Sequence, residues 1–194
     1  MSSKRLTFPA TEEAIRELRA GDEVQVDGHI IGIRDRTQIR IFDQGIEPPM
    51  DLSGAFLLHT APGVRKLGPG KYEKVCIGTT TSARMVRFTE GLGAQYGVRA
   101  ICGKGGLPDE AIEPTQRLGM VYFAIVGGAA ALETTQIEEI EEVAWEELMP
   151  ECLWKFRVKD FGPLTVGIDA HGNSLYREVQ DRAKEKLEEI YARL

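Results

Sequence analysis

Hydroxyl and basic side chains are concentrated in two short runs of this chain. Residues 78–85 hold three threonines, a serine and Arg84, and residues 103–106 place Lys104 inside a glycine-rich loop. Backbone amides and hydroxyls near a helix start can hold an anion, while arginine and lysine supply positive charge. The two runs therefore predict a binding site for a small anion such as a carboxylate.

Three cations follow segments with the pattern of strands: Arg34, Arg84 and Lys104. Ligands of layered α/β folds gather at strand ends, so these side chains are candidates for one site. Arginine can grip a carboxylate with two hydrogen bonds, and lysine acts as a point charge. Together they suit a ligand with two negative groups. The alternative is that all three are ordinary surface charges, as most lysines and arginines are.

Other kinds of site are poorly supported. A G-x-x-x-x-G-K-[ST] loop, a GxGxxG fingerprint and a G-x-S-x-G elbow are absent, which argues against nucleotide binding and a serine hydrolase. His29, His59 and His171 are too dispersed for a histidine metal site, and His171 lies in a Gly-Asn turn. Cys76, Cys102 and Cys152 are far apart and flanked by apolar residues, so they are predicted to be buried thiols rather than disulfide partners or cluster ligands.

Size and composition indicate one globular domain over residues 1–194. The chain is 42% hydrophobic and has a net charge of −6, which argues against a nucleic-acid partner. No apolar run approaches the length of a membrane span, and the first residues lack the apolar stretch of a secretory signal. We therefore expect no membrane contact and a cytoplasmic location.

Hydrophobic periodicity predicts the elements that position the two runs. Helix signals cover residues 11–18, 82–92, 109–118 and 175–194. The last helix has an apolar stripe suited to core packing, with subunit contacts as the alternative. Strand patterns cover residues 24–26 and 30–33 around an Asp27-Gly28 hairpin turn, and then 55–59, 75–77, 98–102, 121–126, 153–158 and 164–168. Strands and helices alternate in the middle of the chain, so the fold class is α/β or α+β: a single layered domain with a mixed sheet.

The same motifs resemble a known family, and the matching blocks extend over most of the chain. They include Arg34-Asp35, Thr80-Thr81-Ser82-Ala83-Arg84-Met85, Gly103-Lys104-Gly105, the glycine-alanine run 127–132, and Asp169-Ala170-His171-Gly172-Asn173. In this order they are similar to the β subunit of class I fumarate hydratase and of L-tartrate dehydratase, and to the C-terminal domain of single-chain class I fumarases. The resemblance implies a swivelling β/β/α domain.

The resemblance also implies an activity, a hydro-lyase that reversibly hydrates fumarate to malate, with tartrate as the alternative diacid. Arg34, Arg84, Lys104 and Thr81 would bind the substrate carboxylates, and Thr80 would be the catalytic residue. A [4Fe-4S] cluster would be carried by a partner α subunit in an α2β2 assembly, and this chain would bind no metal itself. A different class remains open: a stand-alone binding domain for dicarboxylates without catalysis.

The chain departs from the family pattern at two places. Arg36-Thr37-Gln38 follows Arg34-Asp35 where the family continues with alanine and histidine. Thr79 stands where the family has a proline before the threonine pair. The first departure bears on the contacts near Arg34, and the second loosens the turn because proline fixes φ. Both leave room for a different diacid.

Overall fold

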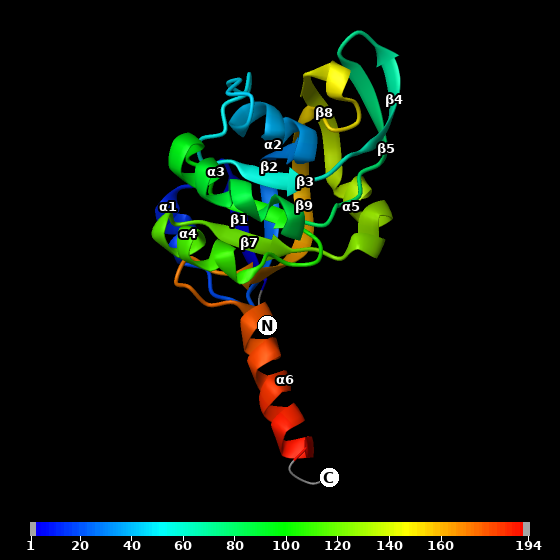
Figure 1. The fold of residues 1–194 in the computed structure, drawn as a ribbon. Helices are drawn as coiled ribbons and strands as arrows, with labels where there is room; N and C mark the ends of the chain where they lie inside the picture. Colours follow the sequence, from blue (N-terminus) through cyan, green and yellow to red (C-terminus); the bar gives the residue numbers. More distant parts are fainter. Residues whose placement is uncertain (1–2, 192–194) are drawn as a thin grey trace.

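A seven-stranded mixed sheet forms the centre of the protein. The structure is a computed structural model that describes residues 3–191, apart from the side chains of residues 129–131 and 188–189. The strand order is β1-β2-β3-β6-β7-β9-β8. Figure 1 shows how the elements are arranged around the sheet. Five neighbouring strands are parallel: β1 (Lys4–Phe8), β2 (Glu23–Ile33), β3 (Phe56–His59), β6 (Ala100–Gly103) and β7 (Val121–Ala124).

The remaining two strands are antiparallel to their neighbours, and one of them closes part of the sheet. β9 (Leu153–Ile168) runs antiparallel to β7 and also to β2, and β8 (Ile137–Ala144) pairs with the first half of β9. Because β9 pairs with β2 as well as β7, strands β2, β3, β6, β7 and β9 form a closed sheet. This bears out the prediction of a layered α/β domain with a mixed sheet, while the swivelling β/β/α fold name stays a prediction.

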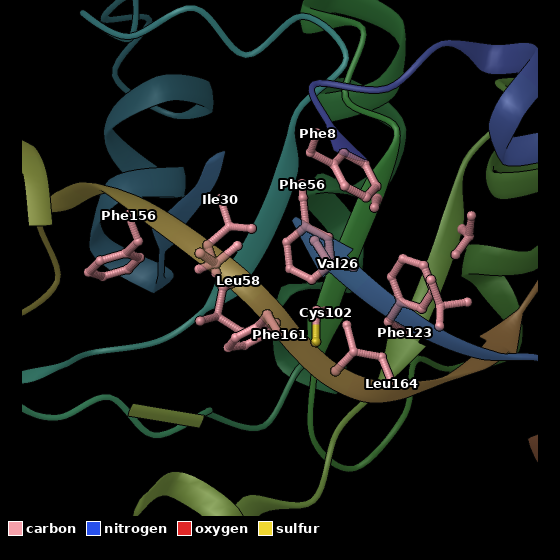
Figure 2. Packing of buried hydrophobic residues seen from close by; sticks show 14 of the residues in the cluster. Phe8, Val26, Ile30, Phe56, Leu58, Cys102, Phe123, Phe156, Phe161 and Leu164 are labelled. Atoms are coloured by element: carbon pink, nitrogen blue, oxygen red, sulfur yellow. The ribbon is translucent and has the colours of Figure 1, made fainter. Parts of the chain in front are cut away.

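Two hydrophobic clusters lie on opposite faces of the parallel strands. Alternate residues of each strand point to opposite faces, so Phe56 and Leu58 of β3 join one cluster and Leu57 joins the other. The first cluster fills the space between the parallel strands and β9. Figure 2 shows Phe56, Phe123 and Phe161 meeting there. The second lies between the sheet and the helices.

Helices cover the outer face of the sheet and end the chain. Five helical segments contribute buried residues to the second cluster, between the sheet and the helices. They are α2 (Asp35–Phe42), the 3-10 helices η1 (Ala83–Phe88) and η2 (Asp109–Ala111), α3 (Thr89–Tyr96) and α4 (Ile112–Arg117). The other helical segments are α1 (Glu12–Arg16), η3 (Gly127–Ala129), α5 (Ala130–Gln136), η4 (Glu146–Leu148) and α6 (Leu175–Tyr191). No helix of the described residues is long and apolar enough to cross a membrane.

The expected hairpin at Asp27-Gly28 is wrong, because β2 continues through it. Gly28 has φ +96° and lies opposite Phe8 of β1, where the ladder with β9 shifts register. Residues 153–158 and 164–168 likewise belong to one strand, β9, which passes through irregular residues instead of stopping. In both cases a bulge keeps a strand going where the local residue types signal a turn.

Replacement of Gly28 by alanine is expected to destabilise the fold by about 2–4 kcal/mol. A Cβ atom at this position would overlap the Phe8 carbonyl oxygen, and the positive φ is unfavourable for alanine. The matched control is Gly68→Ala, because no atom lies within 4 Å of a Cβ placed there. Urea unfolding of the two variants checks this, and equal midpoints would contradict it.

Two other expectations need correction. The helix predicted for residues 82–92 begins as a 3-10 turn at Ala83 and continues past Gly93 to a left-handed Gly97. Cys102 and Cys152 are buried as predicted, but Cys76 is exposed at the end of β5 (Lys71–Cys76), which pairs only with β4 (Gly63–Gly68) in a separate hairpin.

The last helix does not pack into the core. α6 extends away from the body of the molecule (Figure 1), and Val179, Leu187 and Ile190 are 55%, 48% and 54% exposed. The first turn is held through Tyr176, whose ring lies 6.3 Å from that of Tyr122. The predicted helix is thus confirmed over Leu175–Tyr191, and its last residues, 192–194, lie outside the described residues. The expected burial of its apolar stripe within this chain is wrong.

Candidate active site

The predicted site residues meet at one edge of the sheet. β2, β3 and β6 are parallel, so their C-terminal ends lie side by side and bring Arg34, His59 and Lys104 to the same edge. Residues 79–82 run as an extended segment between these strand ends. The Thr80 amide donates to the His59 carbonyl at 2.8 Å, and the Lys104 amide donates to the Thr80 carbonyl at 3.1 Å. The hydroxyl-rich run is therefore fixed by backbone hydrogen bonds on both sides.

Arg84 is held against Thr80 by an aspartate. Its Nε and Nη2 atoms donate to the two carboxylate oxygens of Asp35 at 2.8 and 2.9 Å. Nη2 also lies 3.1 Å from Thr80 Oγ1, to which it donates. Arg34 joins the same carboxylate, with Nε donating to Asp35 Oδ2 at 3.2 Å. One carboxylate thus orients two of the predicted carboxylate-binding arginines, and one of these touches the predicted catalytic hydroxyl.

The charge of Asp35 is favoured by these partners. Partial burial raises the pKa of its carboxyl, but the hydrogen bonds and charge of Arg84, with the hydrogen bond from Arg34, outweigh burial and hold the pKa below its usual value. The same pairing raises the pKa of Arg84. The pair is therefore fully ionised at neutral pH, and the arginines keep a fixed geometry before any ligand arrives.

Lys104 differs from the two arginines. Its ammonium forms no ion pair with any residue that the structure describes, and its chain passes close to Gly127, where an added Cβ would lie 2.7 Å from Lys104 Cδ. Thr81 pairs with Lys104 through its backbone, and both side chains are half-buried. Lys104 is therefore the cation at this edge whose charge is available to a ligand without displacing an internal partner.

The departure from the family pattern at residues 36–38 lies mostly beneath the site. Thr37 and Gln38 are fully buried. The Thr37 hydroxyl accepts from the Arg34 amide at 3.0 Å and lies 2.9 Å from the Glu151 carbonyl oxygen. The Arg36 amide donates to Glu151 Oε2 at 2.9 Å. Through these contacts Thr37 and the Arg36 amide fix the start of α2, and so the backbone that carries Arg34 and Asp35, while the side chain of Arg36 is exposed.

Several residues at this edge were not singled out from the sequence. Asp35 was noted only as a neighbour of Arg34, and Ser82 only as one hydroxyl of the 78–85 run. His59 was considered only as a dispersed histidine, and Tyr122 was given no role. His59 follows three consecutive apolar residues of β3 and ends that strand. Because ligands gather at strand ends, this position could have marked His59 as a candidate site residue. The pairing of Asp35 with Arg84, 49 residues away, had no such signal.

The predicted site does not coincide with the hollow beside the β4–β5 hairpin. A hollow of about 460 Å³ lies elsewhere, between the β4–β5 hairpin and η4, and none of its lining residues is a predicted site residue: Val64, Lys66, Tyr72, Glu146, Glu147 and Met149. Among the described residues no group of three or more histidine, cysteine, aspartate or glutamate side chains is placed to hold a metal ion. The arrangement at the edge is suited to binding carboxylates and to holding a proton at Thr80.

Comparison with known proteins supports the predicted resemblance. The family model described as Fumarase C-terminus matches residues 2–179. The β subunit of L(+)-tartrate dehydratase from Escherichia coli K12 is 41% identical over 188 residues, which cover 96% of this chain and 93% of the relative. A putative β subunit of L(+)-tartrate dehydratase from Methanocaldococcus jannaschii is 36% identical, covering 93% of this chain and 94% of the relative.

A single-chain relative is matched only in part. A putative class I fumarate hydratase from Geobacillus stearothermophilus is 37% identical over 186 residues, which cover 95% of this chain but 36% of that protein. The length of the match thus agrees with a separate β subunit in the first two relatives and with one part of a longer chain in the third. On the family match and these identities, the chain belongs to the fumarase C-terminal family.

Proposed function

We propose that this chain is the β subunit of a hydro-lyase that adds water to, or removes it from, a four-carbon dicarboxylate, and that it is active only with an α subunit. The names and full-length matches of the β-subunit relatives support this proposal. The observation that carries it is the contact between Arg84 Nη2 and Thr80 Oγ1 at 3.1 Å, at an edge that also presents Arg34 and Lys104.

The cations would bind and orient the substrate carboxylates. Asp35 engages Arg84 through Nε and Nη2, and among the described residues Nη1 of Arg84 has no partner, so Nη1 would face the substrate. Lys104 would hold the second carboxylate, with Arg34 and Thr81 beside it. If a proton leaves carbon first, negative charge develops on the adjacent carboxylate, and fixed cations stabilise that charge.

Thr80 would take the proton at Oγ1. A threonine hydroxyl is a poor base unless a neighbour receives its own proton. Here Arg84 already donates to Oγ1, so the hydroxyl proton points away from Arg84, and the positive charge stabilises the oxygen as that proton leaves. We propose that the receiving group is an aspartate of the α subunit, which places the proton relay across the subunit interface.

The [4Fe-4S] cluster is proposed to belong to the α subunit of an α2β2 assembly. The cysteines of this chain do not suit a cluster, because Cys102 and Cys152 are buried in the fold and Cys76 is exposed on the hairpin. When bound in the partner, such a cluster supplies a Lewis acid for the hydroxyl group that leaves. The proposed location of the assembly is the cytoplasm.

From the resemblance we expected fumarate as the first candidate substrate and tartrate as the second. The two full-length relatives both carry tartrate in their names, whereas the fumarate hydratase relative is matched over about a third of its length. We therefore propose L-tartrate as the first substrate to assay and fumarate as the second.

The test is anaerobic purification of the chain with the proteins that associate with it in its own cells. Iron content, tartrate dehydration and fumarate hydration are measured in the same fraction. We expect an iron-rich partner and turnover of one of the two diacids. A lone, iron-free chain that binds tartrate or fumarate without turnover would contradict the proposal and favour a dicarboxylate-binding domain.

A further inference from the structure

Three buried polar side chains form a connected chain directly beneath Thr80. His59, Ser82 and Tyr122 are each at most 1% exposed. His59 lies at the C-terminal end of β3, Ser82 at the end of the 79–82 segment, and Tyr122 within β7. His59 Nδ1 lies 2.9 Å from Ser82 Oγ, and Ser82 Oγ lies 3.1 Å from Tyr122 Oη. Tyr122 Oη lies 2.7 Å from the Gly103 carbonyl oxygen. The chain of contacts therefore links the C-terminal ends of β3 and β6 through Ser82 and Tyr122.

The protons in this chain can be placed by counting donors. The Gly103 carbonyl can only accept, so at 2.7 Å the single proton of Tyr122 goes to it. Tyr122 Oη must then accept from Ser82, and Ser82, having given its proton, must accept from His59. The order of donation is therefore from His59 Nδ1–H to Ser82, from Ser82 to Tyr122, and from Tyr122 to Gly103.

The reverse arrangement at His59 is unfavourable for two reasons. If Ser82 donated to His59, the oxygens of Ser82 and Tyr122 would face each other without a proton between them. His59 would then carry its proton on Nε2, which is buried without a partner among the described residues. Burial lowers the pKa of His59 to about 3, with Asp35 opposing and Arg84 adding to the shift, so the ring is neutral over the working range of pH.

The chain is joined to the site through the backbone. The His59 carbonyl accepts the Thr80 amide at 2.8 Å, and the Ser82 amide donates to the Lys104 carbonyl at 3.0 Å. Ser82 Oγ fills the space where a Cβ of residue 103 would lie, so Gly103 is required for this contact even though its φ is not positive. A shift of any member would therefore move the segment that carries Thr80 relative to Lys104.

We propose that His59, Ser82 and Tyr122 form a one-way hydrogen-bond chain that fixes the Thr80 hydroxyl against the cations, and that the three act as positioning residues for the reaction. None of them touches the substrate in this arrangement. The inference deepens the proposed function and rests on it for the nature of the reaction, but the direction of the chain is a property of the folded protein alone.

The kinetic test uses Tyr122→Phe, Ser82→Ala and the double variant in the assembled enzyme. We expect each single change to lower kcat about 10²-fold, because small displacements of reacting groups have effects of this size. KM should change less than about threefold, since the cations remain. Because the residues act as one chain, the double variant should lose no more than the worse single variant.

The matched control is Tyr72→Phe, which also removes the phenol oxygen of a tyrosine that is only 9% exposed, here one that donates to Glu146 outside the site. Its kcat should equal that of the parent. Losses that multiply in the double variant, or variants with a kcat within twofold of an active parent, would overturn the proposal. So would an equal loss in Tyr72→Phe, because the effect would then follow from the loss of any tyrosine hydroxyl.

The second measurement is independent of turnover. Nitrogen NMR of the assembled enzyme with labelled histidine in this chain distinguishes the two tautomers. The chain has three histidines, and His29→Gln and His171→Gln identify the other two by elimination. An Nδ1–H signal for His59 that does not titrate between about pH 5 and 9 supports the order of donation. An Nε2–H tautomer would overturn it, whereas absence of turnover in the parent would contradict only the proposed reaction.

Discussion

Replacing Arg84 by alanine is expected to lower kcat/KM of the assembled enzyme by about 10³-fold while the chain stays folded. Three effects act together. The change removes a carboxylate-binding guanidinium and the donor that lies 3.1 Å from Thr80 Oγ1. It also leaves Asp35 without its bidentate partner and with only the single hydrogen bond from Arg34, so a less neutralised carboxylate would face an anionic substrate. Stability should change little, because Arg84 is exposed and pairs of this kind contribute little to folding.

The control for this change lies one turn away in the same helix. Arg87 of η1 makes an equivalent bidentate pair with Asp43 of the segment after α2, at 2.9 and 2.6 Å, and its side chain is 56% exposed. Arg87→Ala therefore removes the same charge and the same type of contact outside the site, and its kcat/KM should match the parent. If Arg84→Ala retained more than a tenth of the parent kcat/KM, or if both variants fell together, the assignment of Arg84 would be wrong.

Replacing Thr80 by valine is expected to lower kcat by about 10²–10⁴-fold with little change in KM. Valine keeps the shape of the side chain and the backbone hydrogen bonds to His59 and Lys104, so only the hydroxyl is lost. The cations that bind the carboxylates remain, which is why binding should persist. Steady-state kinetics with tartrate and fumarate measure both constants.

Two further variants separate proton transfer from packing at this position. Thr80→Ser restores the hydroxyl without the methyl group and should recover most of kcat. Thr135→Val removes an exposed hydroxyl that donates to the Leu132 carbonyl on α5, and it should behave as the parent. A Thr80→Val enzyme with more than a tenth of the parent kcat would show that this hydroxyl takes no part in the chemical step.

The local elements of the parallel sheet were predictable because their patterns are local. Residues 55–59 form a short apolar run, and residues 98–102 form another, and both became central parallel strands, β3 and β6. The helix expected from residue 11 also forms, as α1 with Thr11 at its N-cap. Parallel strands separated by helices place their C-terminal ends together, so Arg34 and Lys104 were expected at the same edge before any contact was known.

The errors arose where a distant part of the chain overrides a local signal. Gly28 is typical of a turn, but its backbone pairs with Phe8 and with Val158, and these partners keep β2 continuous. β9 passes through residues that locally end a strand, because β2 and β7 pair with it on either side. In each case the hydrogen bonds that decide the outcome come from strands that are remote in sequence.

Taken alone, the sequence determined the chemical inventory: the hydroxyls at residues 79–82, the three cations, and the alternation of strands and helices that carries them to one edge. Only the tertiary structure decided that Asp35 holds Arg84 against Thr80, that His59, Ser82 and Tyr122 connect beneath them, and that α6 leaves the core. The physical reason is that periodicity reports which face a side chain takes within its own element. Which side chains meet is set by strand pairing and packing between elements that lie tens of residues apart.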